Sequence, residues 1–260
     1  MRLRPLLSLL TAILLPGAAL AANPGADSPG PSAPGADSGW TFSFSPYAWA
    51  SGISGTSGKA PLPYADVKSS FNDIWDNLDI AVMGAFDARK GRYSIIGDLL
   101  YAKTSVTDHN GNGILRKNID ITSETFSSMV GGGYSVLQGP RGNLDLVAGA
   151  RLWSVSTRLS IEGGYLDGRR GRGSATWVDA VGGLKGSYHL TDRTYLTGWA
   201  MVGGGEARLD WDLMAAVGYQ ATKQVSVALG YRALGVDYRQ GGFVYDVVQR
   251  GPMLGMTYQF

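Results

Sequence analysis

Two aspartates, Asp210 and Asp212, have the spacing best suited to acid–base chemistry. They stand two positions apart in a stretch of alternating polar and apolar residues, so both side chains project from one face of a strand. A pair of carboxylates can activate water when a histidine or another acid lies beside it. The chain contains two histidines, His109 and His189, and both are distant in sequence from this pair. We therefore predict no catalytic residue and no enzyme activity.

The segment from Asp108 to Gly113 matches the first half of a calcium-binding loop, with oxygen ligands at the first, third and fifth positions and glycine at the sixth. The ligands would be Asp108, Asn110 and Asn112. The twelfth position is Ile119, whereas such a loop needs a bidentate glutamate there. A tight polar turn is favoured over calcium, and the sequence predicts no metal site and no cofactor.

Three arginines, Arg169, Arg170 and Arg172, are clustered between glycines. Guanidinium groups bind phosphate through paired hydrogen bonds, so the cluster suits either a nucleic acid or the lipopolysaccharide around an exported protein. The formal charge of the whole chain is only +2, whereas nucleic-acid-binding domains usually present a concentrated basic face. We expect contact with lipopolysaccharide and no nucleic-acid partner.

Other charged residues lie inside alternating stretches, where they share a single face. Charge on one strand face is costly in the dry core of a soluble sandwich but fits the polar interior of a barrel. Acids and bases nearly balance, which favours a salt-bridged network that fills the lumen over a conducting pathway. The predicted network consists of Asp87, Arg89, Asp98, Asp145, Arg151, Asp179, Lys185, Asp210, Asp212 and Arg232.

Alternation with a period of two defines the strands that hold these side chains. The faces opposite the charges are apolar and often carry an aromatic residue near one end, as lipid-facing bands do. We predict an all-β fold, a transmembrane antiparallel up-and-down β-barrel of about ten strands, with eight or twelve as alternatives. The predicted strands begin at Trp40 and then cover 78–89, 92–104, 121–137, 143–159, 174–189, 194–206, 209–221, 224–238 and 243–260.

Short turns and longer loops alternate along the chain, as they do in barrels with longer outer loops. The long loops are predicted at 51–77, 105–120 and 160–173. The first contains apolar residues at helical spacing after Ser69 or Ser70 as the N-cap, which predicts a short amphipathic helix. We favour a lid that packs on the barrel rim over a docking surface for a partner or lipid. The apolar stripe consists of Phe71, Ile74, Trp75 and Leu78.

Two segments precede the predicted barrel domain at 40–260. Residues 1–21 carry basic residues before an apolar stretch and end in small residues, which predicts a signal peptide cleaved after Ala21. Residues 22–39 are rich in Pro, Gly, Ala and Ser, so we expect a disordered linker. The chain has no cysteine, which excludes disulfides, thiolate metal sites and cysteine nucleophiles.

The last strand carries a family resemblance. Leu254, Met256, Tyr258 and Phe260 alternate with small or polar residues, and the sequence stops on the aromatic residue. This pattern resembles the C-terminal strand of the small bacterial outer-membrane β-barrel superfamily, in which a terminal Phe with an aromatic residue two positions earlier is read by the barrel-assembly machinery. The resemblance implies a location in the Gram-negative outer membrane, periplasmic termini, and Tyr258 and Phe260 as the assembly signal.

Three classes of function follow from this resemblance. The first, which we favour, is a non-enzymatic envelope protein that is structural or forms a narrow, porin-like solute channel. The second is a cell-surface binding or adhesion protein that acts through its outer loops. The third is an outer-membrane hydrolase of protease or lipase type, since ten-stranded outer-membrane proteases use carboxylates and a histidine at the outer rim. Asp210 and Asp212 invite that comparison but have no neighbouring histidine in sequence.

Overall fold

The computed structural model describes residues 39–59, 64–110, 117–162 and 170–260, so the predicted signal peptide and nearly all of the predicted linker lie outside the described residues. The described chain forms twelve strands and one short helix. None of the described helical residues belongs to a helix long and apolar enough to cross a membrane. The elements are β1 (Thr41–Trp49), β2 (Gly52–Lys59), β3 (Ala65–Ser69), α1 (Phe71–Asp76), β4 (Leu78–Lys90), β5 (Tyr93–Asn110), β6 (Lys117–Gly139), β7 (Gly142–Glu162), β8 (Arg170–His189), β9 (Thr194–Gly205), β10 (Leu209–Gln220), β11 (Val225–Gln240) and β12 (Phe243–Gln259).

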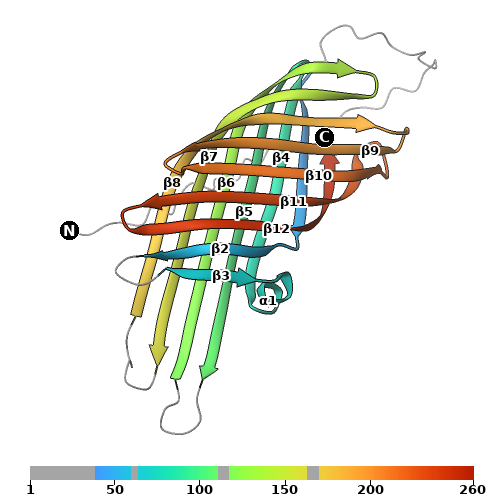
Figure 1. The fold of residues 1–260 in the computed structure, drawn as a ribbon. Helices are drawn as coiled ribbons and strands as arrows, with labels where there is room; N and C mark the ends of the chain where they lie inside the picture. The colour runs from blue at the N-terminus through green and yellow to red at the C-terminus, as the bar shows by residue number, and fades with distance from the viewer. Residues whose placement is uncertain (1–38, 60–63, 111–116, 163–169) are drawn as a thin grey trace, which may run out of the picture. The chain divides into compact units, whose positions relative to one another are not determined.

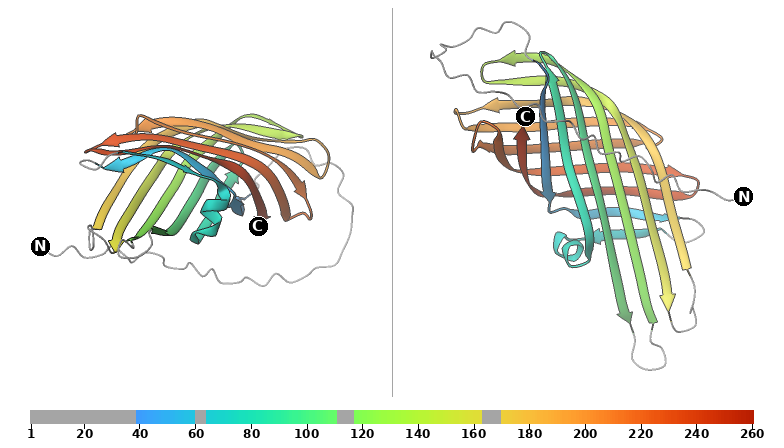
Figure 2. Two further views of the ribbon diagram at one scale, coloured as in Figure 1. Left: turned by 60° about the horizontal axis from the view of Figure 1, so that its bottom comes forward. Right: turned by 180° about the vertical axis from the view of Figure 1, so that it is seen from behind.

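Ten of these strands close into an antiparallel barrel, which confirms the predicted fold. Strand β1 pairs with β4, the strands β4 to β12 follow one another in sequence order, and β12 pairs back with β1. The closing register places Ser43 opposite Gln259 and Trp49 opposite Met253. Strands β4–β8 form one wall, and β9–β12 cross it on the facing side (Figure 1; Figure 2 shows the reverse view). We call the end where β1 begins and β12 ends the near end, and the opposite end the far end.

The prediction of a continuous loop over 51–77 is wrong, because β2 and β3 occupy much of that range. Strand β2 continues the path of β1 along β12, with Gly52 opposite Arg250, and β3 pairs with the other edge of β2. The sequence of β2 has no apolar face, so it lacks the alternation that identifies the other strands. Glycine is required at Gly55, where φ is +146° and an added Cβ would lie 2.0 Å from the Asp246 carbonyl oxygen.

The barrel wall parts between β2 and β4. Strand β4 pairs with β1 only as far as Pro46, which stands opposite Gly84, and proline has no N–H with which to continue the ladder. Beyond this point β2 pairs with β3 instead, and the first residues of β4 pair with β5 alone. Four successive β4 residues, 79–82, are exposed, so both faces of the strand reach solvent there. The ladder that closes the barrel therefore covers only the near half of β4.

Strands β5–β8 extend into the predicted outer loops 105–120 and 160–173. Backbone pairing continues to Asn110 opposite Lys117, so part of each predicted loop belongs to a regular ladder. Asp108 and Asn110 consequently lie in β5 rather than in a calcium-loop turn, and Asn112 lies outside the described residues. In the arginine cluster, Arg169 lies outside the described residues, Arg170 begins β8, and the Arg172 side chain is exposed.

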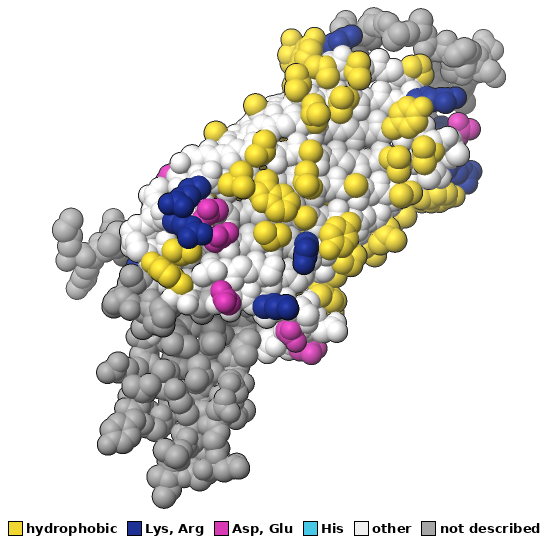
Figure 3. Space-filling view, viewed as in Figure 1, with side chains coloured by type: hydrophobic (Ala, Val, Ile, Leu, Met, Phe, Trp, Pro, Cys, Tyr) yellow, Lys and Arg dark blue, Asp and Glu magenta, His cyan; other side chains and the backbone are white. Residues whose placement is uncertain are grey.

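The outer face of the barrel is apolar, as expected for a surface in contact with lipid. Figure 3 shows apolar side chains over a broad band of one face, with charged side chains toward its margins. Aromatic rings lie toward the near end, where Tyr93 packs edge-on against Tyr134. Exposed apolar residues on this surface include Phe44, Val82, Ile95, Val130, Leu146, Val178, Val202, Leu213, Val217, Leu229, Leu254 and Met256.

Helix α1 begins with the predicted Ser70 cap. The Asp73 amide donates to the Ser70 hydroxyl at 3.3 Å, and the Asp73 carboxylate accepts from the Ser70 amide at 2.8 Å, which completes a capping box. The helix ends before Asn77, so Leu78 lies in β4 and the predicted fourth position of the apolar stripe is wrong. Trp75 is 63% exposed. The stripe is therefore only partly covered, with the Phe71 and Trp75 rings in contact.

The capping box predicts a pH dependence of α1. Hydrogen bonds from Ser70 hold the pKa of the Asp73 carboxyl below its usual value, so they stabilise the helix above the pKa of an ordinary aspartate. This stabilisation is lost as the pH falls through the lowered pKa. Hydrogen–deuterium exchange, corrected for intrinsic rates, should show protection of the Ile74 amide disappearing in acid. Asp73→Asn should remove much of this protection at neutral pH, whereas Asp76→Asn on the same helix should not; equal effects would contradict the capping assignment.

The terminal aromatic residue predicts an assembly phenotype. Phe260 is 72% exposed and its ring touches Tyr258 outside the core, so its deletion removes little packing. If the ring is an assembly signal, deletion should lower the outer-membrane yield, while the unfolding free energy of the folded fraction changes by less than about 0.5 kcal/mol. Membrane fractionation and urea unfolding measure the two quantities. Phe42→Ala, at an exposed aromatic of the same rim, is the control and should leave the yield unchanged; an undiminished yield without Phe260 would refute the signal.

Candidate functional site

A buried guanidinium lies at the centre of the barrel interior. Arg232 on β11 is 1% exposed and binds the carboxylates of Asp98 on β5 and Asp212 on β10. Its terminal nitrogen NH2 lies 2.6 Å from Asp98 Oδ1 and 2.7 Å from Asp212 Oδ2, while Nε donates to Asp212 Oδ1 at 3.1 Å. The Tyr47 hydroxyl accepts from Arg232 at 2.6 Å and donates to Asp98 at 2.8 Å. Side chains from three other strands, β1, β5 and β10, thus contact Arg232.

A second arginine continues the network across the lumen. Arg151 on β7 donates to Asp212 Oδ2 at 2.7 Å and to Asp210 Oδ1 at 2.6 Å. The other oxygen of Asp210 accepts from the Trp153 indole N–H at 2.8 Å. Asp210 and Asp212 are 0% and 1% exposed. The five charged groups of this network carry three negative and two positive charges, and indole and phenol donors supplement the arginines.

Asp179 occupies a separate buried position on β8. Its carboxylate accepts from the Trp177 indole N–H at 2.9 Å and from the Ala207 backbone N–H at 2.8 Å. Ala207 belongs to the turn between β9 and β10, so this contact fixes the turn on the barrel. Asp179 therefore anchors backbone and an aromatic ring rather than a basic side chain.

Two further ion pairs lie nearer the near end. Arg89 binds Asp145, which also accepts from the Ser135 hydroxyl and from the Asn143 amide. Lys185 on β8 binds Asp87 on β4, across the lumen. All ten residues of the predicted charge network therefore lie on the inner face, and the structure joins nine of them in ion pairs.

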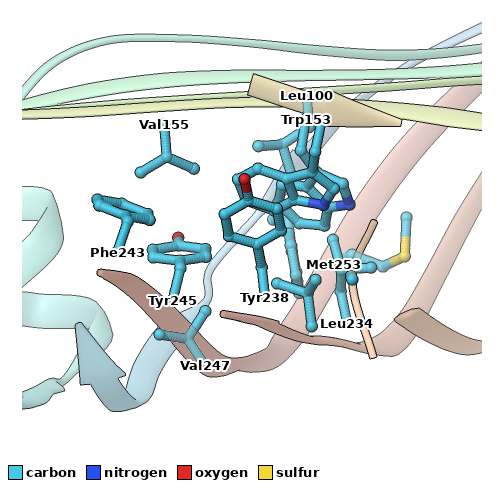
Figure 4. Packing of buried hydrophobic residues seen from close by; sticks show 13 residues of the cluster. Leu100, Trp153, Val155, Leu234, Tyr238, Phe243, Tyr245, Val247 and Met253 are labelled. Carbon is cyan, nitrogen blue, oxygen red and sulfur yellow. The ribbon is translucent and has the colours of Figure 1, made fainter. Parts of the chain in front are cut away.

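Aromatic and aliphatic side chains fill the far half of the lumen. The Tyr238 ring stacks on Trp177 with 4.1 Å between the ring centroids, and Trp177 stacks on Trp153 at 5.8 Å. Figure 4 shows side chains of the two facing walls pointing toward one another in one buried cluster, Leu100 and Val155 from one wall and Tyr245 and Val247 from the other. The interior thus consists of a dry aromatic core at the far end, a charge network beneath it, and paired charges toward the near end.

Sequence analysis missed the aromatic members of this interior. Trp153 lies two residues after Arg151, and Trp177 lies two residues before Asp179, so the same alternation that places the charges inward places both indoles inward. Tyr47 faces inward in the same way on β1. The sequence therefore carries the signal, because both indoles share the face of the charges rather than the apolar face.

The arrangement is unsuited to acid–base catalysis at Asp210 or Asp212. A general base must reach a substrate proton, whereas both carboxylates are buried and accept hydrogen bonds from arginine or indole donors. Among the described residues there is also no cluster of three or more His, Asp or Glu side chains that could hold a metal ion. The network is suited instead to holding the two walls of the barrel together.

Comparison with known proteins identifies the fold. Neither models of known protein families nor curated protein sequences match the chain. Among solved structures, the outer membrane protease OmpT from Escherichia coli aligns with a TM-score of 0.53 at 13% identity, over 85% of this chain and 97% of that protein. The translocator domain of the autotransporter NalP from Neisseria meningitidis aligns with a TM-score of 0.51 at 14% identity, over 86% of this chain and 90% of that domain. The chain therefore shares the β-barrel fold of these two proteins.

The buried network predicts a large cost for removing its central cation. Arg232→Met would leave Asp98 and Asp212 without their main partner in the barrel interior, which should lower the unfolding free energy by about 3–5 kcal/mol. The matched control is Arg239→Met, because Arg239 pairs with Asp237 and Asp246 but is 39% exposed. Its loss should cost about 0–1 kcal/mol. Urea unfolding in detergent, followed by heat-modifiable gel migration, measures both; equal costs would contradict a stabilising role for the network.

Proposed function

We propose that the protein is a non-enzymatic outer-membrane barrel with a structural role in the cell envelope, and that its lumen does not conduct solutes. The observation that carries this proposal is the filled interior. Trp153, Trp177 and Tyr238 stack across the far half, and Arg232 with its acids closes the middle. A conducting pore would need a gap in both layers, and each gap would expose a buried charge or remove aromatic packing.

The apolar outer surface supports an outer-membrane location. Its exposed side chains are those that contact hydrocarbon favourably, and aromatic rings such as Tyr93 and Tyr134 near one end suit the membrane interface. The signal-like residues 1–21 agree with export. In this proposal the near end faces the periplasm, and lipid and lipopolysaccharide surround the barrel.

The burial and pairing of Asp210 and Asp212, the best candidate acids for a hydrolase, disfavour that function. OmpT is an outer membrane protease, but at 13% identity the likeness concerns the fold alone. Asp210 and Asp212 lie inside the barrel with their oxygens occupied by Arg151, Arg232 and Trp153. Because the two carboxylates are 0% and 1% exposed, neither is open to the water molecule that such a hydrolase would activate.

A surface-binding role is the second candidate, and the long strands favour it. Strand β6 has 23 residues, whereas about 9–11 tilted residues span a bilayer. Strands β5–β8 therefore project beyond the apolar band, where Arg158 and Arg172 are exposed and Ser154 shares a hydrogen bond with Thr176 at 3.1 Å. Such a polar sheet with arginines suits phosphate groups of lipopolysaccharide or a surface partner.

The structural proposal predicts that the protein carries no ionic current across planar bilayers. Wild-type protein should give no single-channel steps, because the aromatic core and the charge network both block the lumen. Trp177→Ala/Tyr238→Ala opens only the far layer and should stay silent, because the charge network still closes the middle; adding Arg232→Ala opens both layers and should produce steps or noisy current. Tyr231→Ala, an exposed tyrosine of β11, is the control and should stay silent. Regular steps from the wild type would refute the proposal and favour a narrow channel.

A further inference from the structure

A chamber of about 320 Å³ lies inside the barrel between the charge network and the near end. Tyr47 and Asp212 of the network line its closed end. The lining residues toward the near end, such as Ser43, Asn143 and Thr257, are partly exposed. Arg151, Asp212 and Met253, at the other end of the chamber, are buried. The chamber is therefore blind, with its mouth at the near end of the barrel.

The body of the chamber is apolar and rich in methionine. Met129, Met201, Met214 and Met253 line it together with Trp199. Thioether side chains are polarisable and adapt their shape, and they make favourable contacts with aromatic rings. Ala216 and Ala228 on the neighbouring wall leave the space open. The chamber therefore suits a compact apolar or aromatic group.

The mouth of the chamber carries an excess of accessible positive charge. Arg89 and Lys185 are 26% and 24% exposed, whereas their partners Asp145 and Asp87 are 0% and 20% exposed. Arg89, Lys185 and Asp87 are thus accessible from inside the barrel, whereas Asp145 is not. The Lys185 ammonium has three N–H donors, and within the described residues its one hydrogen-bond partner is Asp87. These unused donors suit an anion.

The closed end of the chamber is unfavourable for an anion. The Arg232 donors are taken by Asp98, Asp212 and Tyr47, and Asp98, the partly exposed acid of the network, is 16% exposed there. A ligand with one charged group would therefore place that group at the mouth and its apolar part inward.

We propose that this chamber binds a small amphipathic carboxylate. The apolar or aromatic body packs among the methionines and Trp199, and the carboxylate accepts hydrogen bonds from Lys185 and Arg89 at the mouth. The volume lies at the lower end of the range for small-molecule sites, which is about 300–1,000 Å³. This binding site adds a ligand to the structural role proposed above and does not depend on it, because a blind chamber needs no conduction.

Ligand-observed NMR and calorimetry with the protein in phosphatidylcholine nanodiscs test the proposal. The probes are phenylacetate, its neutral analogue phenylacetamide and the cation phenethylamine. Phenylacetate should bind at least about fivefold more tightly than either analogue, as expected for charge-assisted hydrogen bonds. Ala228→Phe fills the chamber and should abolish binding. Ala200→Phe makes the same change on the outer face and should leave binding intact.

A second variant separates the head group from the apolar body. Lys185→Gln should reduce the preference for phenylacetate over phenylacetamide to near equality, while the amide still binds. Heat-modifiable migration verifies that each variant is folded. Three results would overturn the proposal: no binding of phenylacetate, binding that survives Ala228→Phe, or a preference for the amine.

Discussion

The structure depends on the requirement that charge inside a narrow barrel be paired and hydrogen-bonded. Arg232 meets this requirement by binding Asp98, Asp212 and Tyr47 at once, and it lies over the rings of Trp49 and Trp199 at 5.3 and 5.1 Å. These partners come from β1, β5, β9 and β10, so a shift of any of these strands by one residue would turn a charged or aromatic side chain out of the lumen. The interior charges thus help to fix the register of these strands, which backbone hydrogen bonds alone do not specify.

The same alternation explains how far the sequence could predict this interior. The sequence predicts Asp98, Arg151 and Arg232 to face the lumen because each lies opposite an apolar face, and a period of two shows this without any knowledge of partners. Which acid meets which base could not be predicted, since Lys185 reaches Asp87 across the lumen and Arg151 bridges two acids of β10. Those pairings depend on the relative height of distant strands, which local sequence does not encode.

Strands without an apolar face escaped prediction for a different reason. Strand β2 is a run of Gly, Ser and Thr with a single Ile and a final Lys, so no alternation marks it. The far parts of β5–β8 are mostly polar, and their apolar alternation is short, as at Ile119 and Ile121 or at Leu159 and Ile161. They are held by pairing with neighbours whose patterns are clear, as β2 is by β12. The aromatic core was not predicted because aromatic residues were expected at the ends of the lipid-facing bands, although Trp153 and Trp177 lie on the charged faces of their strands.

The parted wall gives a physical reason for the aromatic core. Beyond Pro46 the hydrogen-bonded cylinder is no longer closed between β2 and β4, and an aqueous lumen there would be open to the side. A dry interior removes this problem, because side chains from facing walls can pack as they do between two sheets. Met83 of β4 and Ile53 of β2, on the two sides of the parting, both pack against that core. The far half therefore packs as two facing sheets do, and the chamber lies toward the near half, where the ladder is closed.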